Sequence, residues 1–469
     1  MSESVALAWS DESLRDEVTL LLQQLLRIDT SNPPGNETPA AELLRDYLEA
    51  AGLRCELVAR RPDRANLIAR LPGRGDGPSL ALLGHTDVVP ALDAAEWTHP
   101  PFSGHLDDAG FVWGRGALDM KNQTATRAVA LATLSRAGFV PGGDIVFIAQ
   151  ADEEDGRDQF GLSWLARQRP DLACDYSLDE GGGRRFDLAD GRGVQTINVG
   201  EKATLPVLLT ALGESGHASV PKDSNAVVRL ATLTLRLAAH STELRTSPQT
   251  RHLLDLLVGA GSTGDGANGA GNGRADDGGN LVGRIERAGT LHPWLGENLP
   301  ASFRATIAPT RLTGSTALNV LAERASVECD CRVLPGMTAD DLRREFVAAL
   351  GTDLPYTIEF LEDVQGGSAS PIGTPLYELC QDFLDADDPG TTLLPTVTTG
   401  FNDSYFMRSE FGTVAYGFWP DRHTPPAAYD GVHGRDERVH VDDLLHATRF
   451  HLFVAQRIGL CNPKHEELR

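Results

Sequence analysis

Two periods of hydrophobic residues alternate along the first part of the chain. Residues 11–29 and 39–52 place apolar side chains every three or four positions, which predicts amphipathic helices. The runs 79–84 and 144–151 are short and almost entirely apolar, which is typical of strands buried on both faces of a sheet. Because strands and helices alternate up to about residue 199, we predict an α/β fold built on a mostly parallel sheet.

The pattern changes near residue 200 and changes back near residue 369. Between them, residues 203–212 alternate polar and apolar side chains, which indicates a half-buried strand of a small α+β domain inserted into the first domain. The expected boundaries are 1–199 and 369–469 for the first domain, and 200–368 for the inserted domain. Residues 259–280 consist almost wholly of Gly, Ala, Asn, Asp and Ser, so we expect a flexible insertion there.

Composition narrows the possible partners and the cellular location. The chain has 469 residues and a formal net charge of −24, which argues against nucleic acid or an anionic membrane as a partner. The first residues lack the basic start and apolar segment of a signal peptide, and no apolar run is long enough to span a membrane. The six cysteines are scattered without a CxxC pair, which is typical of reduced thiols, so we expect the cytoplasm.

Candidate chemistry begins where a predicted strand ends. The strand 79–84 runs directly into His85 and Asp87, and residues two apart in a strand face the same side. Open α/β sheets place their sites at the carboxyl ends of the strands. A histidine there can bind a metal through one ring nitrogen while a carboxylate holds the other nitrogen. A His-x-Asp pair by itself, however, is more often part of a surface loop.

Other carboxylates and a second histidine lie after predicted strands or in nearby loops. Asp119 comes after two glycines and directly before a predicted helix, where it could also be a simple helix cap. The remaining candidates are Glu153 and Glu154 after strand 144–151, Glu180 after a short strand, and His433 in a late loop. Four adjacent acids at residues 152–155 usually form a solvated turn, but beside a core strand they are also what a divalent cation or a general base requires.

A nitrogen and oxygen ligand set is formed by five of these residues: His85, Asp119, Glu154, Glu180 and His433. Two histidines and three carboxylates without sulfur suit zinc, with cobalt or manganese as alternatives. If one carboxylate bridges two ions, the result is a dinuclear site that activates water for attack on amide or ester carbonyls. Glu153 lies next to a candidate ligand and is a natural general base for that water.

Six motifs in a fixed order support this chemistry independently. They are LGHTDVVP from Leu83, GRGxxDMK from Gly114, DEE from Asp152, LDEG from Leu178, GHAS from Gly216 and HxxDER from His433. Together they resemble the dizinc family of aminoacylase, acetylornithine deacetylase, succinyl-diaminopimelate desuccinylase and glutamate carboxypeptidase. The similarity extends from about residue 14 to residue 457. It implies a parallel-sheet zinc-peptidase catalytic domain with an inserted lid and dimerisation domain.

The resemblance also implies roles for individual residues. One zinc ion would be held by His85 and Glu180, the other by Glu154 and His433, and both by a bridging Asp119 that precedes a cis peptide to Met120. Asp87 would orient His85, and Glu153 would take the proton of the water and pass it to the leaving amine. Family members differ at Asp179 and Glu180, and Glu180 is chosen because aminoacylase-like members carry the same LDEG pattern.

Four residues of the later chain complete the implied site. His217 resembles the histidine that reaches a neighbouring subunit's site and stabilises the oxyanion, although it could be an ordinary strand-end histidine. Asn319 and Arg332 resemble residues that hold the carboxylate of the substrate, and Arg332 could instead form a salt bridge within the lid. Gly400 stands where the family often has Gly-Thr-Asp-Ala and is expected to keep that backbone shape, whereas Phe401 and Asn402 depart from the pattern.

The predicted function is therefore hydrolysis of an amide bond next to a free carboxylate. Substrates would be short peptides or N-acyl amino acids, and the enzyme would be a homodimer through its inserted domain. A dedicated deacetylase or desuccinylase of amino-acid biosynthesis is the alternative within this class. The alternative outside it is a non-catalytic metal-binding relative, but such a protein would be expected to lose Glu153 or Asp119, and both are present.

Overall fold

The computed structural model describes residues 9–156, 159–259 and 278–461. Within them the chain forms two compact units. Unit 1 comprises Met1–Val199, Ser370–Leu394 and Asn402–Arg469, and unit 2 comprises Gly200–Ala369 and Pro395–Phe401. The insertion expected at residues 259–280 lies, apart from its first and last few residues, outside the described part of the chain.

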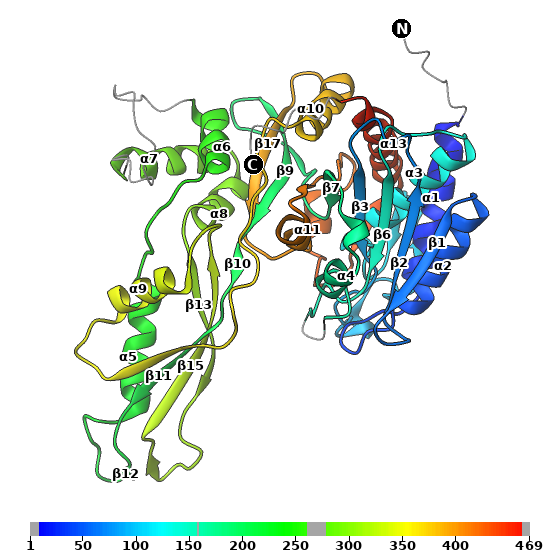
Figure 1. Cartoon of the computed structure of the whole chain (residues 1–469). Helices are drawn as coiled ribbons and strands as arrows, with labels where there is room; N and C mark the ends of the chain where they lie inside the picture. The colour runs from blue at the N-terminus through cyan, green and yellow to red at the C-terminus, as the bar shows by residue number, and fades with distance from the viewer. Residues whose placement is uncertain (1–8, 157–158, 260–277, 462–469) are drawn as a thin grey trace. The chain divides into compact units, whose positions relative to one another are not determined.

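A large twisted sheet forms the centre of unit 1 (Figure 1). Its strands run in the order β1-β2-β6-β3-β7-β18-β9-β17, with β8 beside β9. Their bounds are Arg54–Ala59 (β1), Ala65–Leu71 (β2), Leu80–His85 (β3), Ile145–Gln150 (β6), Tyr176–Asp179 (β7), Arg185–Asp187 (β8), Gly193–Glu201 (β9), Thr392–Thr398 (β17) and Val414–Gly417 (β18). The central strands β6, β3, β7 and β18 are parallel. This confirms the α/β fold with a mostly parallel central sheet.

The margins of the sheet differ from its centre. Strand β1 is antiparallel to β2, and β2 is antiparallel to β6. Every residue of β3 and β6 is buried, because these strands lie in the middle of the sheet with helices over both faces. An apolar run at the centre of the sheet therefore looks continuous, whereas β1 at the edge shows an intermittent pattern of burial.

Helices cover the sheet of unit 1. On one side, α1 (Asp11–Leu26), α3 (Lys121–Arg136) and α13 (Val441–Arg457) pack against one another. Helix α2 (Thr38–Ala50) lies on β1 and β2, and α10 (Pro375–Asp387) contacts α13. The short helices α4 (Leu162–Gln168) and α11 (Ser404–Phe411) pack together, with α11 against β7 and β18. As expected for a capped amphipathic helix, α1 begins after Ser10, whose side chain accepts a hydrogen bond from the Ser13 N–H.

A small second sheet lies outside the elements that the sequence pattern predicted. Strands β4 (His105–Leu106) and β5 (Phe111–Trp113) pair with β19 (Arg438–His440), which precedes α13. The strands have two or three residues each, too few to show a period in the sequence. This sheet ties the loop before α3 to the segment that carries His433.

Unit 2 is an antiparallel sheet with helices. Its strands are β10 (Ala203–Thr204), β11 (Val207–Leu212), β13 (Thr306–Thr313), β15 (Arg324–Val333) and β16 (Tyr356–Phe360). Burial alternates along β15, as expected for a sheet covered on one face, and α5 (Ala226–Ala239) and α9 (Ala339–Leu350) provide that cover. Helix α7 (Gly278–Gly289) packs against both α6 (Pro248–Val258) and α8 (Pro293–Ser302). A short antiparallel pair, distant in sequence, joins β12 (Gly216–His217) to β14 (Val320–Leu321). The expected α+β character of the insertion is confirmed.

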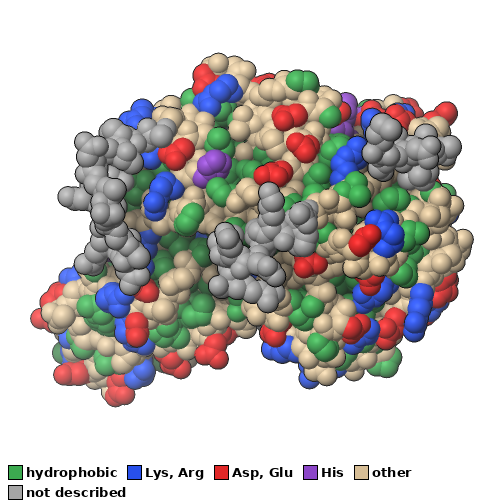
Figure 2. Space-filling model, turned by 45° about the horizontal axis from the view of Figure 1, so that its top comes forward, with side chains coloured by type: hydrophobic (Ala, Val, Ile, Leu, Met, Phe, Trp, Pro, Cys, Tyr) green, Lys and Arg blue, Asp and Glu red, His purple; other side chains and the backbone are tan. Residues whose placement is uncertain are grey.

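The surface carries many charged side chains (Figure 2), as expected from the charged residues of the sequence. On the face drawn in Figure 2, acidic and basic side chains are interspersed over the surface. Among the helices of the described residues, none has the length and apolar character needed to cross a membrane.

Candidate metal centre

The carboxyl ends of the parallel strands in unit 1 bring the predicted ligands together. His85 is the last residue of β3, Glu180 directly follows β7, and Glu154 follows β6 by four residues. The other two come from loops: Asp119 lies just before α3, and His433 follows the short helix α12 (Pro426–Tyr429). Neighbouring parallel strands end at the same edge of a sheet, so three of the five side chains converge for topological reasons.

His85 forms the first ligand group with Asp119 and Glu180. Its Nε2 atom lies 3.1 Å from Asp119 Oδ1 and 3.4 Å from Glu180 Oε2. Its Nδ1 atom lies 2.9 Å from the carbonyl oxygen of Asp87, to which it can donate a proton. When Nδ1 carries the proton, the lone pair of Nε2 points at two carboxylates. Such a triad is stable only with a cation or an extra proton between the three groups, and the imidazole is completely buried.

His433 forms the second group with Glu154 and the same Asp119. Its Nε2 atom lies 3.2 Å from Asp119 Oδ2 and 3.2 Å from Glu154 Oε2. Asp119 is therefore shared, with one carboxylate oxygen directed to each histidine. The side chain of His433 is 57% exposed and that of Glu154 only 4%, so the group is open to solvent from the histidine side.

The ligand set fits a pair of divalent cations. In each group the three candidate ligand atoms lie within 4.8 Å of one another, and both groups consist of nitrogen and oxygen donors, which suits zinc-type ions. Hydrogen bonds to Asp119 and Glu154 raise the pKa of His433 to about 10. Burial raises the pKa of Asp119, but the hydrogen bonds from His433 and His85 outweigh burial and hold that pKa below its ordinary value. Burial raises the pKa of Glu180 to about 7. Asp119 and Glu154 thus favour a positive charge at His433, and a cation beside that imidazole can supply it.

Asp87 fixes the segment that carries the proposed base. It lies two residues beyond the end of β3, and its buried carboxylate accepts the backbone N–H of Glu153 at 3.2 Å and that of Glu154 at 3.0 Å. The Asp87 carboxylate is also 3.5 Å from His85 Nδ1. Asp87 thus contacts both the predicted ligand His85 and the loop after β6, although the shorter contact to the imidazole comes from its carbonyl.

Glu153 has the environment of an acid–base group. Within the described part of the chain, its carboxylate makes no hydrogen bond and no ion pair. Burial and the negative charge of Glu180 raise the pKa of Glu153 well above its ordinary value. A carboxyl group held in this way can accept a proton and return it at neutral pH.

Glu437 is a residue whose role the sequence did not reveal. Its buried carboxylate accepts the backbone N–H groups of Gly116, Leu118 and Asp119 at 3.0, 2.7 and 2.9 Å. It also pairs with the guanidinium of Arg115 at 2.7 Å. The loop that carries the shared ligand is thereby wrapped around one carboxylate. The HxxDER motif contained this residue, but spacing alone gives no indication of its partners.

Asn32 is a second such residue. Its Nδ2 group donates to Asp87 Oδ2 at 2.9 Å and to Asp152 Oδ1 at 3.0 Å. Arg64 donates to the same oxygen of Asp152 at 3.0 Å and pairs with Glu37, so a buried network joins α2 to the ligand loops. In the sequence Asn32 precedes two prolines, which indicated only a turn.

The other predicted residues belong to unit 2. His217 is exposed, and its Nδ1 atom accepts hydrogen bonds from the Oγ of Ser219 at 2.7 Å and from the Ser219 N–H at 3.2 Å. In its neutral form the Nε2 atom therefore carries a proton that it can donate. Asn319 is exposed beside this pair of strands, and its carbonyl accepts the N–H of Ala218 at 3.0 Å.

Arg332 and Gly400 have less distinctive surroundings. The guanidinium of Arg332 donates to both carboxylate oxygens of Asp330, at 2.7 and 3.0 Å, and to Thr204 Oγ1 at 2.9 Å. A Cβ atom at Gly400 would meet no atom within 4 Å, so packing does not require glycine there.

A sheet of this topology, with two ligand groups that share one carboxylate at its strand ends, defines a metal-binding hydrolase of the metallopeptidase type. The sequence profile of peptidase family M20/M25/M40 matches residues 81–457, and the chain belongs to this family. The family resemblance that the six motifs indicated is thereby confirmed, as is the class of metal-dependent amidohydrolase.

Similar proteins cover nearly the whole chain. A succinyl-diaminopimelate desuccinylase of Methylobacterium radiotolerans is 34% identical over 458 residues, which are 94% of this chain and 96% of that protein. One of Paracoccus denitrificans is 26% identical over 458 residues, which are 93% and 97% of the two chains. Among solved structures, an M20-family metallo-carboxypeptidase from Sulfolobus solfataricus superposes with a TM-score of 0.68 at 16% identity, covering 95% of this chain and 100% of that one.

Proposed function

We propose that this protein hydrolyses an amide bond next to a free carboxylate in N-acyl amino acids or short peptides, with two zinc ions per chain. Cobalt or manganese could replace zinc in a ligand set of this kind. The observation that carries the proposal is the position of Asp119. Its two carboxylate oxygens lie 3.1 Å from His85 Nε2 and 3.2 Å from His433 Nε2, which is the arrangement that a bridging ligand needs.

The proposed mechanism assigns a task to each side chain of the centre. His85 and Glu180 would hold one ion, Glu154 and His433 the other, and Asp119 both. When bound, such ions polarise the substrate carbonyl and make a water molecule more acidic. Glu153 would remove the proton from the attacking water and deliver it to the leaving amine, as its raised pKa favours. Asp87 would hold His85 and the loop of Glu153 in fixed positions relative to each other through the contacts described above.

Unit 2 would supply the remaining polar groups. We propose that the Nε2–H of His217 stabilises the oxyanion that forms at the substrate carbonyl, because its Nδ1 is already occupied as an acceptor. Asn319, Arg332 and the backbone at Gly400 would hold the carboxylate of the substrate. Asp330 already accepts hydrogen bonds from Nε and Nη2 of Arg332, and Nη1 donates to Thr204. To bind the substrate carboxylate, Arg332 would therefore use Nη1 in place of its bond to Thr204.

The surface of unit 2 supports a homodimer. Helix α5 exposes Val227, Val228 and Leu235, with exposed fractions of 43%, 60% and 71%. Near the strands β12 and β14, Leu318 is fully exposed and Val320 is 44% exposed. Apolar side chains in this number on one helix and beside one pair of short strands are typical of a surface that binds another protein. We therefore propose that two copies associate through unit 2. We also place the protein in the cytoplasm, which its six free thiols support.

A second candidate function is supported by the similar proteins. The relatives named above are succinyl-diaminopimelate desuccinylases, and one is 34% identical over nearly its full length. A succinyl amide beside a free carboxylate belongs to the proposed substrate class. A dedicated desuccinylase would therefore use the same centre and the same base, with a narrower substrate pocket.

A hydrolysis screen separates these functions. Zinc-loaded protein is incubated with N-acetyl, N-succinyl and longer N-acyl amino acids and with dipeptides, and products are measured by mass spectrometry, with Glu153→Ala as the blank. Turnover of several acyl amino acids or dipeptides supports the broad hydrolase. Turnover of the succinylated substrate alone supports the desuccinylase. No turnover with both metals bound contradicts both and favours a non-catalytic metal-binding protein.

A further inference from the structure

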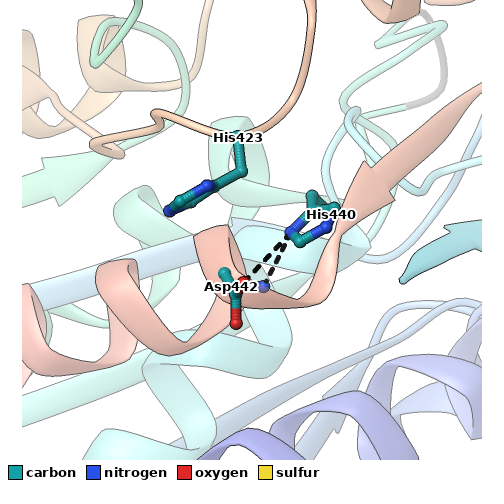
Figure 3. Close-up of side chains that lie close together, drawn as sticks. All are labelled: His423, His440 and Asp442. Atoms are coloured by element: carbon teal, nitrogen blue, oxygen red, sulfur yellow. Dashed lines mark hydrogen bonds and ion pairs between the residues drawn. The ribbon is translucent and has the colours of Figure 1, made fainter. Parts of the chain in front are cut away.

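A third group of possible metal ligands lies in unit 1 and shares no residue with the two groups around Asp119. It consists of His423, His440 and Asp442, whose ligand atoms lie within 4.8 Å of one another. Figure 3 shows the three side chains, which come from the loop before α12, the end of β19 and the first turn of α13. The two imidazole rings are 5.4 Å apart between centroids and tilted by 31° relative to each other.

The ring of His440 directs its Nδ1 atom, and not Nε2, toward Asp442. Nδ1 accepts the backbone N–H of Asp442 at 3.2 Å, so it carries a lone pair, and it lies 3.7 Å from Asp442 Oδ2. The Nε2 side of the ring is covered by Gly110, because a Cβ atom at that position would stand 3.0 Å from Nε2. An edge contact with the ring of Phe111, at 5.0 Å between centroids, also holds the imidazole. A carboxylate oxygen thus lies close to Nδ1, and a cation would replace the Asp442 N–H as the partner of the Nδ1 lone pair.

A buried network fixes the backbone beneath this group. The carboxylate of Asp443 is completely buried and accepts the N–H of His423 at 2.9 Å and that of Thr424 at 2.6 Å. The hydroxyl of Thr424 in turn accepts the N–H of His440 at 3.0 Å. The loop of His423 and the strand of His440 are therefore both held at the first turn of α13. A cation would meet a preformed backbone, which lowers the entropic cost of gathering the ligands.

We propose that His423, His440 and Asp442 form a further binding site for a zinc-type divalent cation, separate from the centre around Asp119. Two imidazoles and one carboxylate are a typical set for such ions and leave one position for water. Tetrahedral zinc brings neighbouring ligand atoms to roughly 3.3 Å from one another. The exposed side chain of His423 can rotate to close the remaining distance, while the Asp442 N–H exchanges its present acceptor for water.

The neighbouring charges set the expected strength of this site. Asp442 Oδ1 is paired with the guanidinium of Arg15 at 3.1 Å, which leaves Oδ2 for the cation. A nearby positive charge opposes cation binding. We therefore expect the site to fill at a higher zinc concentration than the centre around Asp119, which has three carboxylates.

The test counts ions on the full chain. Wild type, His423→Ala, His440→Ala and Asp442→Asn are dialysed against increasing zinc concentrations, and bound zinc is measured by mass spectrometry. His105→Ala is the matched control, because His105 is an exposed histidine that stacks on His99 at 3.9 Å and belongs to none of the three ligand groups. Wild type and His105→Ala should bind one more ion per chain than His423→Ala and Asp442→Asn at saturation.

Two results would overturn the proposal. One is equal zinc content in wild type and His423→Ala at saturation. The other is an anomalous difference map at the zinc edge, from crystals soaked with zinc, that shows density around Asp119 and none between His423 and His440. His440→Ala removes the side chain at the start of α13 and could impair folding, so the exposed His423 carries the decisive comparison. Because the measure is a difference between variants, it does not depend on how many ions bind around Asp119.

Discussion

Glu437 holds the backbone of Asp119: its carboxylate oxygen Oε1 accepts the Asp119 N–H at 2.9 Å. Two further N–H groups of the same loop, those of Gly116 and Leu118, donate to this carboxylate. The loop has no regular secondary structure, so these hydrogen bonds decide where the shared ligand lies between the two histidines. A residue that touches no ligand side chain therefore determines the geometry of the centre.

Glu437→Gln is expected to weaken metal binding. The amide lacks the charge that attracts three N–H donors, and it leaves the buried Arg115 without its ion partner. Loss of a residue that orients a metal ligand typically reduces metal affinity or activity by about 10- to 100-fold. Zinc affinity measured by competition with a chelator should fall by that order, while Glu410→Gln, on the exposed end of α11, should match wild type. Equal affinity in Glu437→Gln and wild type would show that the loop keeps its shape without this carboxylate.

Glu153→Gln is expected to remove catalysis and leave the metal sites intact. The amide keeps the size of the side chain but accepts no proton at neutral pH, and general acid–base groups typically contribute 10²- to 10⁴-fold in rate (about 3–5 kcal/mol). Turnover of the best substrate from the screen should fall by at least about 100-fold. Zinc content and the melting temperature should stay close to wild type. Turnover near the wild-type rate would exclude Glu153 as the base.

Lys202 is expected to make the stability of unit 2 depend on pH above neutrality. Burial lowers the pKa of Lys202 to about 7 from an ordinary value of 10.5, and its ammonium donates to the carbonyls of Ala301 and Arg304 at 3.2 and 3.0 Å. Between these two pH values the unfolded chain binds a proton that the folded chain does not. The free energy of unfolding should therefore rise with pH across this interval, by at most about 1.4 kcal/mol per pH unit.

Urea unfolding at several pH values measures this contribution. The free energy of unfolding of Lys202→Met should not rise with pH in this way. Relative to wild type, the variant should therefore become steadily less stable from pH 7 to pH 10. Lys222→Met, which removes a lysine with a 38% exposed side chain from the same unit, should run parallel to wild type. Parallel curves for Lys202→Met and wild type would mean that Lys202 has no depressed pKa.

Charged substitutions on α5 are expected to prevent the proposed dimer. Val228→Asp and Leu235→Asp place carboxylates on the exposed apolar face of this helix, where burial in an interface would cost several kcal/mol per charge. Sedimentation velocity should then show monomers at concentrations where wild type is dimeric. Leu20→Asp, at a 54% exposed leucine of α1 in unit 1, should leave the dimer unchanged. A dimer that survives both α5 substitutions would place the contact elsewhere.

The sequence by itself determined the class of fold and predicted most residues of the candidate centre. Continuous apolar runs identified β3 and β6, because a strand covered on both faces has no exposed side on which to place polar residues. The polar residues directly after such runs, His85 and Glu154 among them, could then be assigned to one edge of the sheet. Neighbouring parallel strands end at the same edge of the sheet. Residues that directly follow such strands in the sequence therefore also lie close together in space.

The tertiary structure decided how those residues are combined. Hydrophobic periods carry no information about strand direction, and only the structure showed that β1 and β2 are antiparallel at the margin. Asp119 and His433 lie in loops, whose conformation depends on hydrogen bonds from distant residues rather than on local preference. Glu437 accepts such a bond from Asp119, and Asn32 donates to Asp87 in the loop after β3, in both cases across a large distance in the sequence. Such contacts exist only after folding, because long-range packing, and not the local sequence, brings the partners within bonding distance.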